Sequence, residues 1–299
     1  MSDAAVDRAR LDAHAEAVLR AWDMVPEGVV RRVAAARVGS AVAHCFPAAD
    51  DDALMVITDV FTWLTAFDDH YERAGVRTSL AVARLVASLE RPDGVPHPVG
   101  VGSAVAAFAA VRARCRAVLG PEQDDRLADA LRGYFLAVLW EQSAPGADTD
   151  TFFAMRRHLS FGRVLPVLVE VATGHAVPPG LLRAPSMRVL RDRFADVVAL
   201  FNDLASAAWE TEHAAGPPDA VPANTLALLR AEHPGIGAEE ARTRVRAMLA
   251  HASAEVELRY EELHRSTTEA GRAHLDGLRD FLAGLLTLRM PDRYATPAR

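Results

Sequence analysis

The chain has 299 residues, of which 51% are hydrophobic, so it carries enough apolar surface for a buried core and is not expected to be disordered. Its 33 basic and 40 acidic residues give a net charge of −7, and the absence of a basic block argues against nucleic-acid binding. The two cysteines, Cys45 and Cys115, cannot form a disulfide framework and lack the spacing of a zinc site.

The N-terminus is charged from the start and lacks the apolar core of a signal peptide. No apolar run reaches the ~18 residues that a membrane-spanning helix needs. The sequence therefore predicts a soluble, cytoplasmic protein that has neither a membrane nor a nucleic acid as a partner.

Apolar side chains recur at intervals of three or four residues through most of the chain, which predicts amphipathic helices. The strongest such segments are, in chain order, residues 50–73, 124–142, 184–213, 238–264 and 268–288. Stretches rich in Pro, Gly, Ala and Asp break the pattern near 91–102, 143–150 and 214–224. We predict one all-α domain over residues 1–299, with flexible ends at 1–24 and 296–299. The helices are expected to form a bundle that encloses an apolar cavity.

An acidic cluster ends the first of these predicted helices, in the sequence Phe67-Asp68-Asp69-His70-Tyr71-Glu72. Asp68 and Glu72 are four residues apart and share one helical face, whereas Asp69 is turned by about 100°. Carboxylates at the C-terminal end of a helix oppose its dipole and repel one another. A bound Mg²⁺, which prefers oxygen ligands, would relieve both costs.

A second set of oxygen donors lies in the predicted helix 184–213. Asn202, Ser206 and Glu210 follow one another at intervals of four residues, so their side chains form a line along one face. An amide, a hydroxyl and a carboxylate oxygen are all suitable ligands for Mg²⁺. If the two sets face each other across the bundle, they could hold several Mg²⁺ ions, for which a diphosphate is the natural anion.

These two motifs, DDxxE at Asp68, Asp69 and Glu72 and NDxxSxxxE at Asn202, Ser206 and Glu210, resemble those of bacterial class I terpene synthases. The segment before the first motif, with Pro47 and Trp63, also resembles the family's lead-in. Near the C-terminus, Arg293-Tyr294 resembles a pair that donates hydrogen bonds to diphosphate in the family. The resemblance extends from about residue 25 to residue 296, and it implies the class I terpenoid synthase fold.

The segment Arg157-His158-Leu159-Ser160-Phe161-Gly162 resembles the part of the family that senses diphosphate. The resemblance implies that Arg157 is the sensor, with Ser160 as the linker and Phe161 as the effector at a helix break. Arg156 is the alternative register. An arginine suits this role because its guanidinium can bond two diphosphate oxygens at once.

The resemblance implies a lyase, a terpene cyclase, in which Asp68, Glu72, Asn202, Ser206 and Glu210 bind three Mg²⁺ ions, with Mn²⁺ as a substitute. Diphosphate would be bound by Arg157, Asn202, Arg293 and Tyr294, while Asp69 and Glu72 act more through closure than through direct ligation. Farnesyl diphosphate is the expected substrate, the products are a sesquiterpene and diphosphate, and a homodimer is the family-level expectation. The expected cavity residues are Phe61, Trp63, Leu64, Phe67, Ser160, Phe161, Phe201 and Trp209.

One departure from the family keeps alternatives open. Many members carry Lys just before the Glu of the second motif, where it helps to bind diphosphate, and here that position is Trp209. Trp209 belongs either to the site or to the core. The main alternative that Trp209 leaves open is a non-catalytic relative that binds a prenyl ligand. Because the volume of the cavity decides the chain length of the substrate, a cyclase of geranyl or geranylgeranyl diphosphate is a further alternative.

Overall fold

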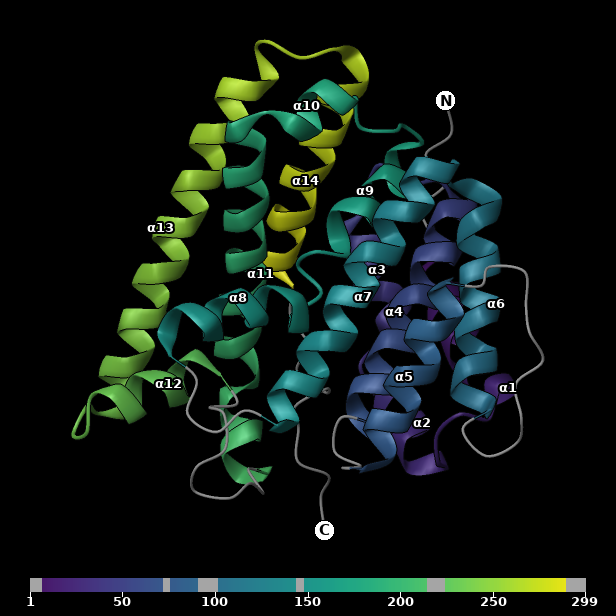
Figure 1. Cartoon of the computed structure of the whole chain (residues 1–299), viewed down its shortest axis with the longest axis horizontal. Coiled ribbons are helices and arrows are strands. Elements are labelled where there is room, and N and C mark those ends of the chain that lie inside the picture. The colour runs from purple at the N-terminus through teal and green to yellow at the C-terminus, as the bar shows by residue number, and fades with distance from the viewer. Residues whose placement is uncertain (1–6, 72–75, 91–101, 144–147, 214–223, 289–299) are drawn as a thin grey trace.

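The computed structural model describes residues 7–71, 76–90, 102–143, 148–213 and 224–288. Within these ranges the chain forms helices and no strand, as Figure 1 shows, so the predicted all-α class is confirmed. The five predicted helical segments correspond to α4, α7, α11, α13 and α14, with ends that agree within about one turn. The helices of the first half are α1 (Arg8–Trp22), α2 (Glu27–Ala35), α3 (Val38–Cys45), α4 (Asp51–Tyr71), α5 (Val76–Glu90), α6 (Gly102–Val118) and α7 (Pro121–Ser143). Those of the second half are α8 (Thr149–Leu159), α9 (Leu165–Thr173), α10 (Pro179–Arg183), α11 (Pro185–His213), α12 (Thr225–Glu232), α13 (Ala238–His264) and α14 (Glu269–Thr287).

Short polar side chains begin several of these helices by accepting a hydrogen bond from a backbone N–H of the first turn. Asp148 caps α8 through the N–H of Thr151 at 2.9 Å, and Asn224 caps α12 through the N–H of Ala227, also at 2.9 Å. Such caps satisfy N–H groups that have no partner inside the helix. Local sequence therefore fixes where α8 and α12 begin, although the sequence analysis did not predict these two short helices.

The helices pack in two groups, which are connected by α8 and α9 and by a direct contact between α3 and α14. In one group α11 contacts α13 along its length and also contacts α14 and α12; in the other α4 contacts α3, α5 and α6 (Figure 1). Helix α8 contacts α11 and α7, whereas α9 contacts α4, α7 and α14. Helix α11 carries Asn202, and α4 carries the acidic cluster. The chain segment between α8 and α9 therefore joins a neighbour of α11 to a neighbour of α4.

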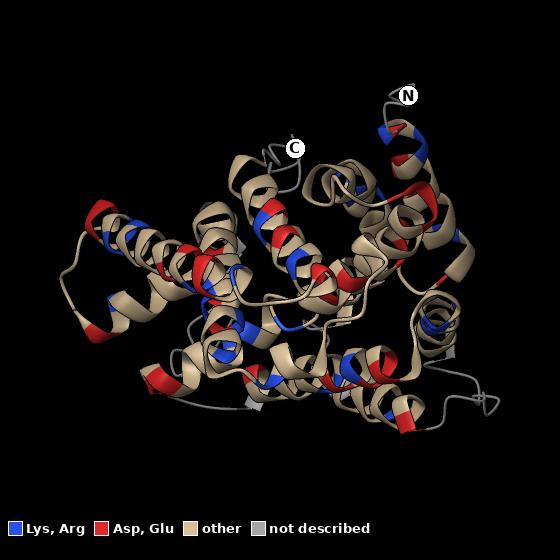
Figure 2. Ribbon diagram, turned by 90° about the horizontal axis from the view of Figure 1, so that it is seen from above, with Lys and Arg blue, Asp and Glu red and all other residues tan. Residues whose placement is uncertain are grey.

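Charged residues of both signs are interspersed along the helices, without a face of one sign in the view of Figure 2. Cys45 and Cys115 are both buried free thiols, and burial raises the pKa of each to about 12. Both therefore stay protonated and behave as small apolar core residues. Among the described helices, none combines the length and the apolar character needed to cross a membrane.

Candidate functional site

The acidic cluster of the first motif lies at the C-terminal end of α4. Asp68 is half-buried there, and Asp69 accepts a hydrogen bond from Nε of Arg32 on α2 at 3.0 Å. The hydroxyl of Tyr71 donates to a backbone carbonyl of the α1–α2 connection at 3.1 Å. Asp69 and Tyr71 thus bind the end of α4 to α2 and to the α1–α2 connection. Asp68 remains the predicted metal ligand of this end. Glu72 lies outside the described residues.

The second motif lies on α11. Ser206 is 2% exposed, and its hydroxyl donates to the backbone carbonyl oxygen of Asn202 at 2.9 Å. A hydroxyl that has given its only proton to a carbonyl can still accept or ligate through its lone pairs. Helix α11 continues past Glu210, which stands one turn beyond Ser206, but the side chains of Glu210 and Trp209 lie outside the described part.

The donor types of these residues fit a hard divalent cation. Asp68, Asn202 and Ser206 contribute a carboxylate, an amide and a hydroxyl oxygen, which are ligands typical of Mg²⁺ and not of a soft metal. In the described ranges, no group of three or more His, Cys, Asp or Glu side chains has the arrangement of a metal site. Binding of Mg²⁺ by the described residues would therefore depend on Asn202 and Ser206 together with Asp68.

Two neighbouring arginines of α8 are paired with carboxylates of α11, and their surroundings differ. Arg156 pairs with Asp203, whose side chain is fully buried. The other carboxylate oxygen of Asp203 accepts hydrogen bonds from the backbone N–H and the hydroxyl of Thr225, at 2.8 and 2.6 Å. Asp203 therefore joins α8, α11 and the start of α12, which is a structural role although the residue stands inside the NDxxSxxxE motif.

Arg157 pairs with Asp196 through two parallel hydrogen bonds. Its Nε donates to Oδ1 at 2.7 Å and its Nη2 donates to Oδ2 at 3.1 Å. Burial disfavours the charged guanidinium, but the hydrogen bonds and the charge of Asp196 outweigh it, so the pKa of Arg157 is raised. With 21% of its side chain exposed, against 9% for Arg156, Arg157 is the more accessible of the two.

The chain turns sharply between α8 and α9. Phe161 adopts a left-handed conformation with φ of 63°, which costs an aromatic residue about 1–3 kcal/mol. Before it, Ser160 ends α8, and its hydroxyl is buried with no hydrogen-bond partner among the described residues. After it, Gly162 lies directly against Ala195 of α11. The segment predicted to contain the linker and the effector thus forms the break between α8 and α9, pressed against α11.

This contact predicts the effect of Gly162→Ala. An added Cβ would lie 2.6 Å from the Cβ of Ala195 and 2.8 Å from its Cα, so the break would have to move away from α11. We expect the free energy of unfolding to fall by about 1–3 kcal/mol. The urea midpoint measures the change. Gly28→Ala in α2 is the control, because its Cβ would meet no atom within 4 Å and should stabilise the helix by about 0.5–1 kcal/mol. Equal midpoints for the two variants would contradict the expected clash.

Aromatic side chains connect α4 with this break. Phe67 is fully buried and stacks between Trp63 and Tyr71, with ring centroids 4.9 and 5.1 Å away. Tyr134 of α7 meets Phe67 edge-on at 6.3 Å and Phe161 at 5.2 Å. Phe67 and Phe161, both predicted to line the cavity, are thus joined through Tyr134. The sequence analysis missed Tyr134, because its place on the predicted helix 124–142 does not show which neighbours it meets.

Trp63 has the environment of a core residue. Its indole N–H donates to the carbonyl oxygen of Ala104 in α6 at 3.1 Å, and its side chain is 1% exposed. Five residues before Asp68, it is turned by about 140° from that carboxylate on an α-helix. Its role as a cavity wall therefore stays a prediction that this environment does not favour. Phe61 and Phe201 are half-buried, and Leu64 is 1% exposed.

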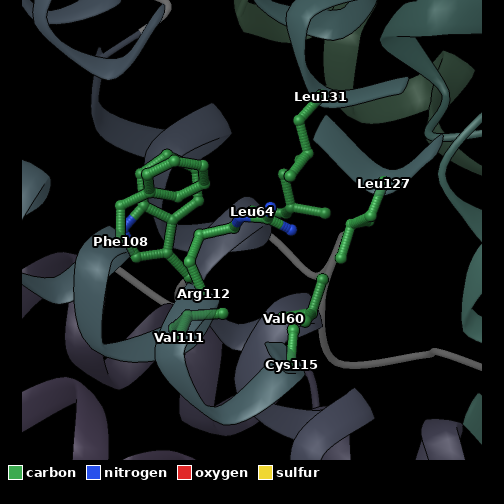
Figure 3. A pocket seen from close by; sticks show the side chains of 9 residues that line it. Val60, Leu64, Phe108, Val111, Arg112, Cys115, Leu127 and Leu131 are labelled. Atoms are coloured by element: carbon green, nitrogen blue, oxygen red, sulfur yellow. The ribbon is translucent and has the colours of Figure 1, made fainter. Parts of the chain in front are cut away.

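A small pocket between α4, α6 and α7 lies beside Trp63 (Figure 3). The space open to a water-sized sphere is about 10 Å³, room for roughly one water, so it cannot hold a prenyl chain. Arg112 reaches into it, pairs with Asp124 at 2.5 Å, and is 3% exposed. The lining residues are Val60, Trp63, Leu64, Phe108, Val111, Arg112, Cys115, Leu127 and Leu131.

The remaining predicted site residues, Arg293 and Tyr294, lie outside the described residues, as does Glu72. The structure also assigns a partner that the sequence analysis missed, Asp196. The sequence does carry a sign of this partner, because Asp196 is the lone charge in the apolar stretch FADVVALF. Asp196 stands seven residues before Asp203, so both carboxylates lie on the same face of α11.

Comparisons with known families and with single proteins all find terpene synthases. A family model described as terpene synthase family 2, C-terminal metal binding, matches residues 59–255, from the middle of α4 into α13. The chain is 35% identical over 214 residues to the labda-7,13(16),14-triene synthase of Streptomyces clavuligerus, covering 68% of this chain and 61% of that protein. It is 30% identical over 288 residues to the (12E)-labda-8(17),12,14-triene synthase of Streptomyces cyslabdanicus, covering 94% of this chain and 86% of that protein.

A more distant relative is the 4-epi-cubebol synthase of Streptosporangium roseum, which cyclises (2E,6E)-farnesyl diphosphate. It is 27% identical, over 85% of this chain and 77% of its own length. Among solved structures, linalool/nerolidol synthase from Streptomyces clavuligerus in complex with 2-fluorogeranyl diphosphate superposes with a TM-score of 0.80, over 94% of this chain and 98% of that one. At 24% identity this likeness shows the shared fold. The chain belongs to the bacterial class I terpene synthases, which are lyases that act on diphosphates.

Proposed function

We propose that this protein is a Mg²⁺-dependent terpene cyclase that ionises an allylic prenyl diphosphate, with farnesyl diphosphate as the first candidate, and releases diphosphate. The observation that carries the proposal is the pair Asn202 and Ser206 on α11. Ser206 is buried, and its proton is given to the carbonyl of Asn202, so its oxygen is available as a ligand. An amide oxygen and a hydroxyl oxygen on one face of a helix are ligands that a hard cation such as Mg²⁺ prefers.

In this proposal, Asp68, Asn202, Ser206 and Glu210 hold the metal, with Glu72 beside them, and Arg157, Arg293 and Tyr294 donate to the diphosphate. Three Mg²⁺ ions, or Mn²⁺ in their place, would stabilise the negative charge that develops when the C–O bond breaks and its electron pair passes to the diphosphate. The arginines add charge-assisted hydrogen bonds to the same oxygens.

The aromatic residues serve the organic part of the reaction. The faces of aromatic rings attract positive charge, so Phe67, Tyr134 and Phe161 could stabilise a carbocation held between α4 and the α8–α9 break. A closed apolar site also keeps water away while the cation rearranges. We assign this role to the aromatic rings alone, because the polar side chains of the site are proposed to bind the metal ions and the diphosphate.

The relatives keep the chain length of the substrate open within this proposal. The cubebol synthase is named for the cyclisation of farnesyl diphosphate, whereas the names of the two labdatriene synthases indicate a labdane product. Geranyl diphosphate, geranylgeranyl diphosphate and a labdane-type diphosphate are therefore the alternative substrates. A location in the cytoplasm and a homodimer are part of the same proposal.

The test is an incubation of the purified protein and Mg²⁺ with each of these four diphosphates. Gas chromatography–mass spectrometry reads the extracted products, and a phosphate assay reads the diphosphate released. We expect one substrate, farnesyl diphosphate, to give a hydrocarbon or alcohol, and we expect this product to disappear with EDTA and with Asn202→Ala. Replacing Mg²⁺ with Mn²⁺ should retain activity.

The alternatives predict other results. Turnover of a different diphosphate would keep the reaction and change the substrate. No turnover of any of the four, together with Mg²⁺-independent binding of prenyl diphosphate, would overturn the proposal and favour a non-catalytic prenyl-binding relative.

A further inference from the structure

A buried arginine of α6 has N–H groups without an acceptor. Arg112 is 3% exposed, and its Nη2 lies 2.5 Å from Oδ1 of Asp124 on α7. Its Nε and Nη1 are buried and have no hydrogen-bond partner among the described residues. A donor that is buried without an acceptor costs free energy, and it costs more when the group is charged. These N–H groups therefore call for a further partner.

The same side chain reaches into the small pocket between α4, α6 and α7 (Figure 3). The other lining side chains are aliphatic or aromatic, apart from the thiol of Cys115. The indole N–H of Trp63, which also lines the pocket, is already donated to the carbonyl oxygen of Ala104. The pocket thus presents the donors of Arg112 and no strong acceptor.

The carboxylate that pairs with Arg112 is shared. Oδ2 of Asp124 accepts a hydrogen bond from Nε of Arg116 at 3.2 Å, so Asp124 divides its charge between two arginines. Burial lowers the pKa of Arg112, and the charge of Asp124 opposes this only in part. A further negative charge beside the guanidinium would therefore stabilise its charged form.

A second buried carboxylate near the pocket is already matched. Asp59 directly precedes Val60, a lining residue of α4, and is 1% exposed. It pairs with Arg114, and its Oδ1 lies 2.7 Å from Nε2 of His14. Asp59 therefore leaves the charge of Arg112 uncompensated, and its own charge is taken up by these partners.

The size of the pocket and its donors favour a single-atom anion as the occupant. The space open to a water-sized sphere is about 10 Å³, which is too small for phosphate or a carboxylate. A water molecule there would accept from Arg112, but its own protons would meet ring faces and the Cys115 sulfur, which are weak acceptors. A halide ion is only slightly larger than water, accepts without donating, and supplies a counter-charge.

We infer that this pocket is a halide site, in which chloride accepts hydrogen bonds from Nε and Nη1 of Arg112. The ion balances the buried guanidinium and holds α6 against α4 and α7. Trp63, a wall of the pocket, stacks on Phe67 with ring centroids 4.9 Å apart, so the ion also supports the aromatic stack of α4. The halide is a structural ligand, and its binding does not depend on the proposed function.

Crystals grown with sodium bromide in place of chloride test the site directly, because bromide gives an anomalous signal in X-ray diffraction and water does not. We expect an anomalous peak in the pocket, within hydrogen-bonding distance of Nε and Nη1 of Arg112. A pocket that is empty, or that holds density without an anomalous signal, would overturn the inference.

Thermal unfolding measures the same binding in solution. Replacing gluconate with bromide at constant ionic strength should raise the melting temperature by about 2–5 °C, because an ion that binds only the folded state stabilises it. Gluconate is too large for the pocket. Arg112→Met should abolish the rise. Arg132→Met is the matched control that should keep it, since Arg132 pairs with Glu90 and Asp129 at the protein surface.

A second variant covers the case in which Arg112→Met does not fold. Val111→Ile keeps the arginine and adds a methyl group to the lining, so it should reduce the rise by taking up the space of the ion. An equal rise in the wild-type protein and in these variants would place the bromide effect elsewhere and overturn the inference. None of these residues belongs to the proposed metal or diphosphate site, so such a result would leave the proposed function standing.

Discussion

If Ser206 is a metal ligand as proposed, Ser206→Ala should lower the rate of diphosphate release by roughly 10²–10³-fold while leaving the fold intact, because it removes that ligand and little else. The hydroxyl of Ser206 is buried and donates only to the carbonyl of Asn202 one turn earlier, a bond that adds little to helix stability. The measurements are the initial rate at saturating substrate and the concentration of Mg²⁺ that gives half-maximal activity. The half-maximal Mg²⁺ concentration should rise.

Helix α13 supplies a matched control. The hydroxyl of Ser253 donates to the carbonyl of Leu249, also one turn earlier, at 2.8 Å, which is the same bond as that of Ser206 at 2.9 Å. Ser253→Ala should therefore have the same small effect on unfolding and no effect on the rate. If both variants lose activity alike, or if neither does, Ser206 has no ligand role.

Much of the fold could be predicted from the sequence, because helix formation follows a local period. The apolar spacing in residues 50–73 and 184–213 located α4 and α11 to within about a turn. The same period placed Asn202 and Ser206 on one face, and the structure keeps them there. The period therefore shows which residues of one helix share a face, and it does not show which other helix that face meets.

The parts that could not be predicted depend on contacts between helices. Asp196 and Arg157 are 39 residues apart, and nothing in either segment shows that they form a pair. Trp63 belongs to the lead-in of the motif, but the carbonyl of Ala104 in α6 determines where its indole points. A motif gives the residue types, whereas packing decides which of them face the site.

Asp203 illustrates the same limit within the motif itself. It follows Asn202 directly and, like Asp68, has a carboxylate that could ligate a metal. On α11, however, it is turned by about 100° from Asn202 and lies on the face that packs against α8. Its partners, Arg156 and Thr225, use both of its oxygens.

Asp203→Ala should therefore destabilise the protein by about 3–5 kcal/mol, since it leaves the guanidinium of Arg156 buried without its counter-charge. The backbone N–H and hydroxyl of Thr225 would also lose their acceptor. The change should appear as a lower urea midpoint with an unchanged slope. Glu240→Ala is the control, because Glu240 and Arg244 form an exposed pair on α13 that is expected to contribute about 0.5 kcal/mol.

A double variant then separates stability from diphosphate binding. Replacing both members of a buried ion pair with apolar residues is often nearly neutral, so Arg156→Met should restore most of the stability lost in Asp203→Ala. The stable double variant retains Arg157 with its partner Asp196. If Arg157 is the residue that binds diphosphate, this variant should bind Mg²⁺–diphosphate within about threefold of the wild-type protein, because Arg156 serves only its pair with Asp203. A recovered urea midpoint with diphosphate binding still lost would contradict this assignment and make Arg156 the diphosphate-binding arginine.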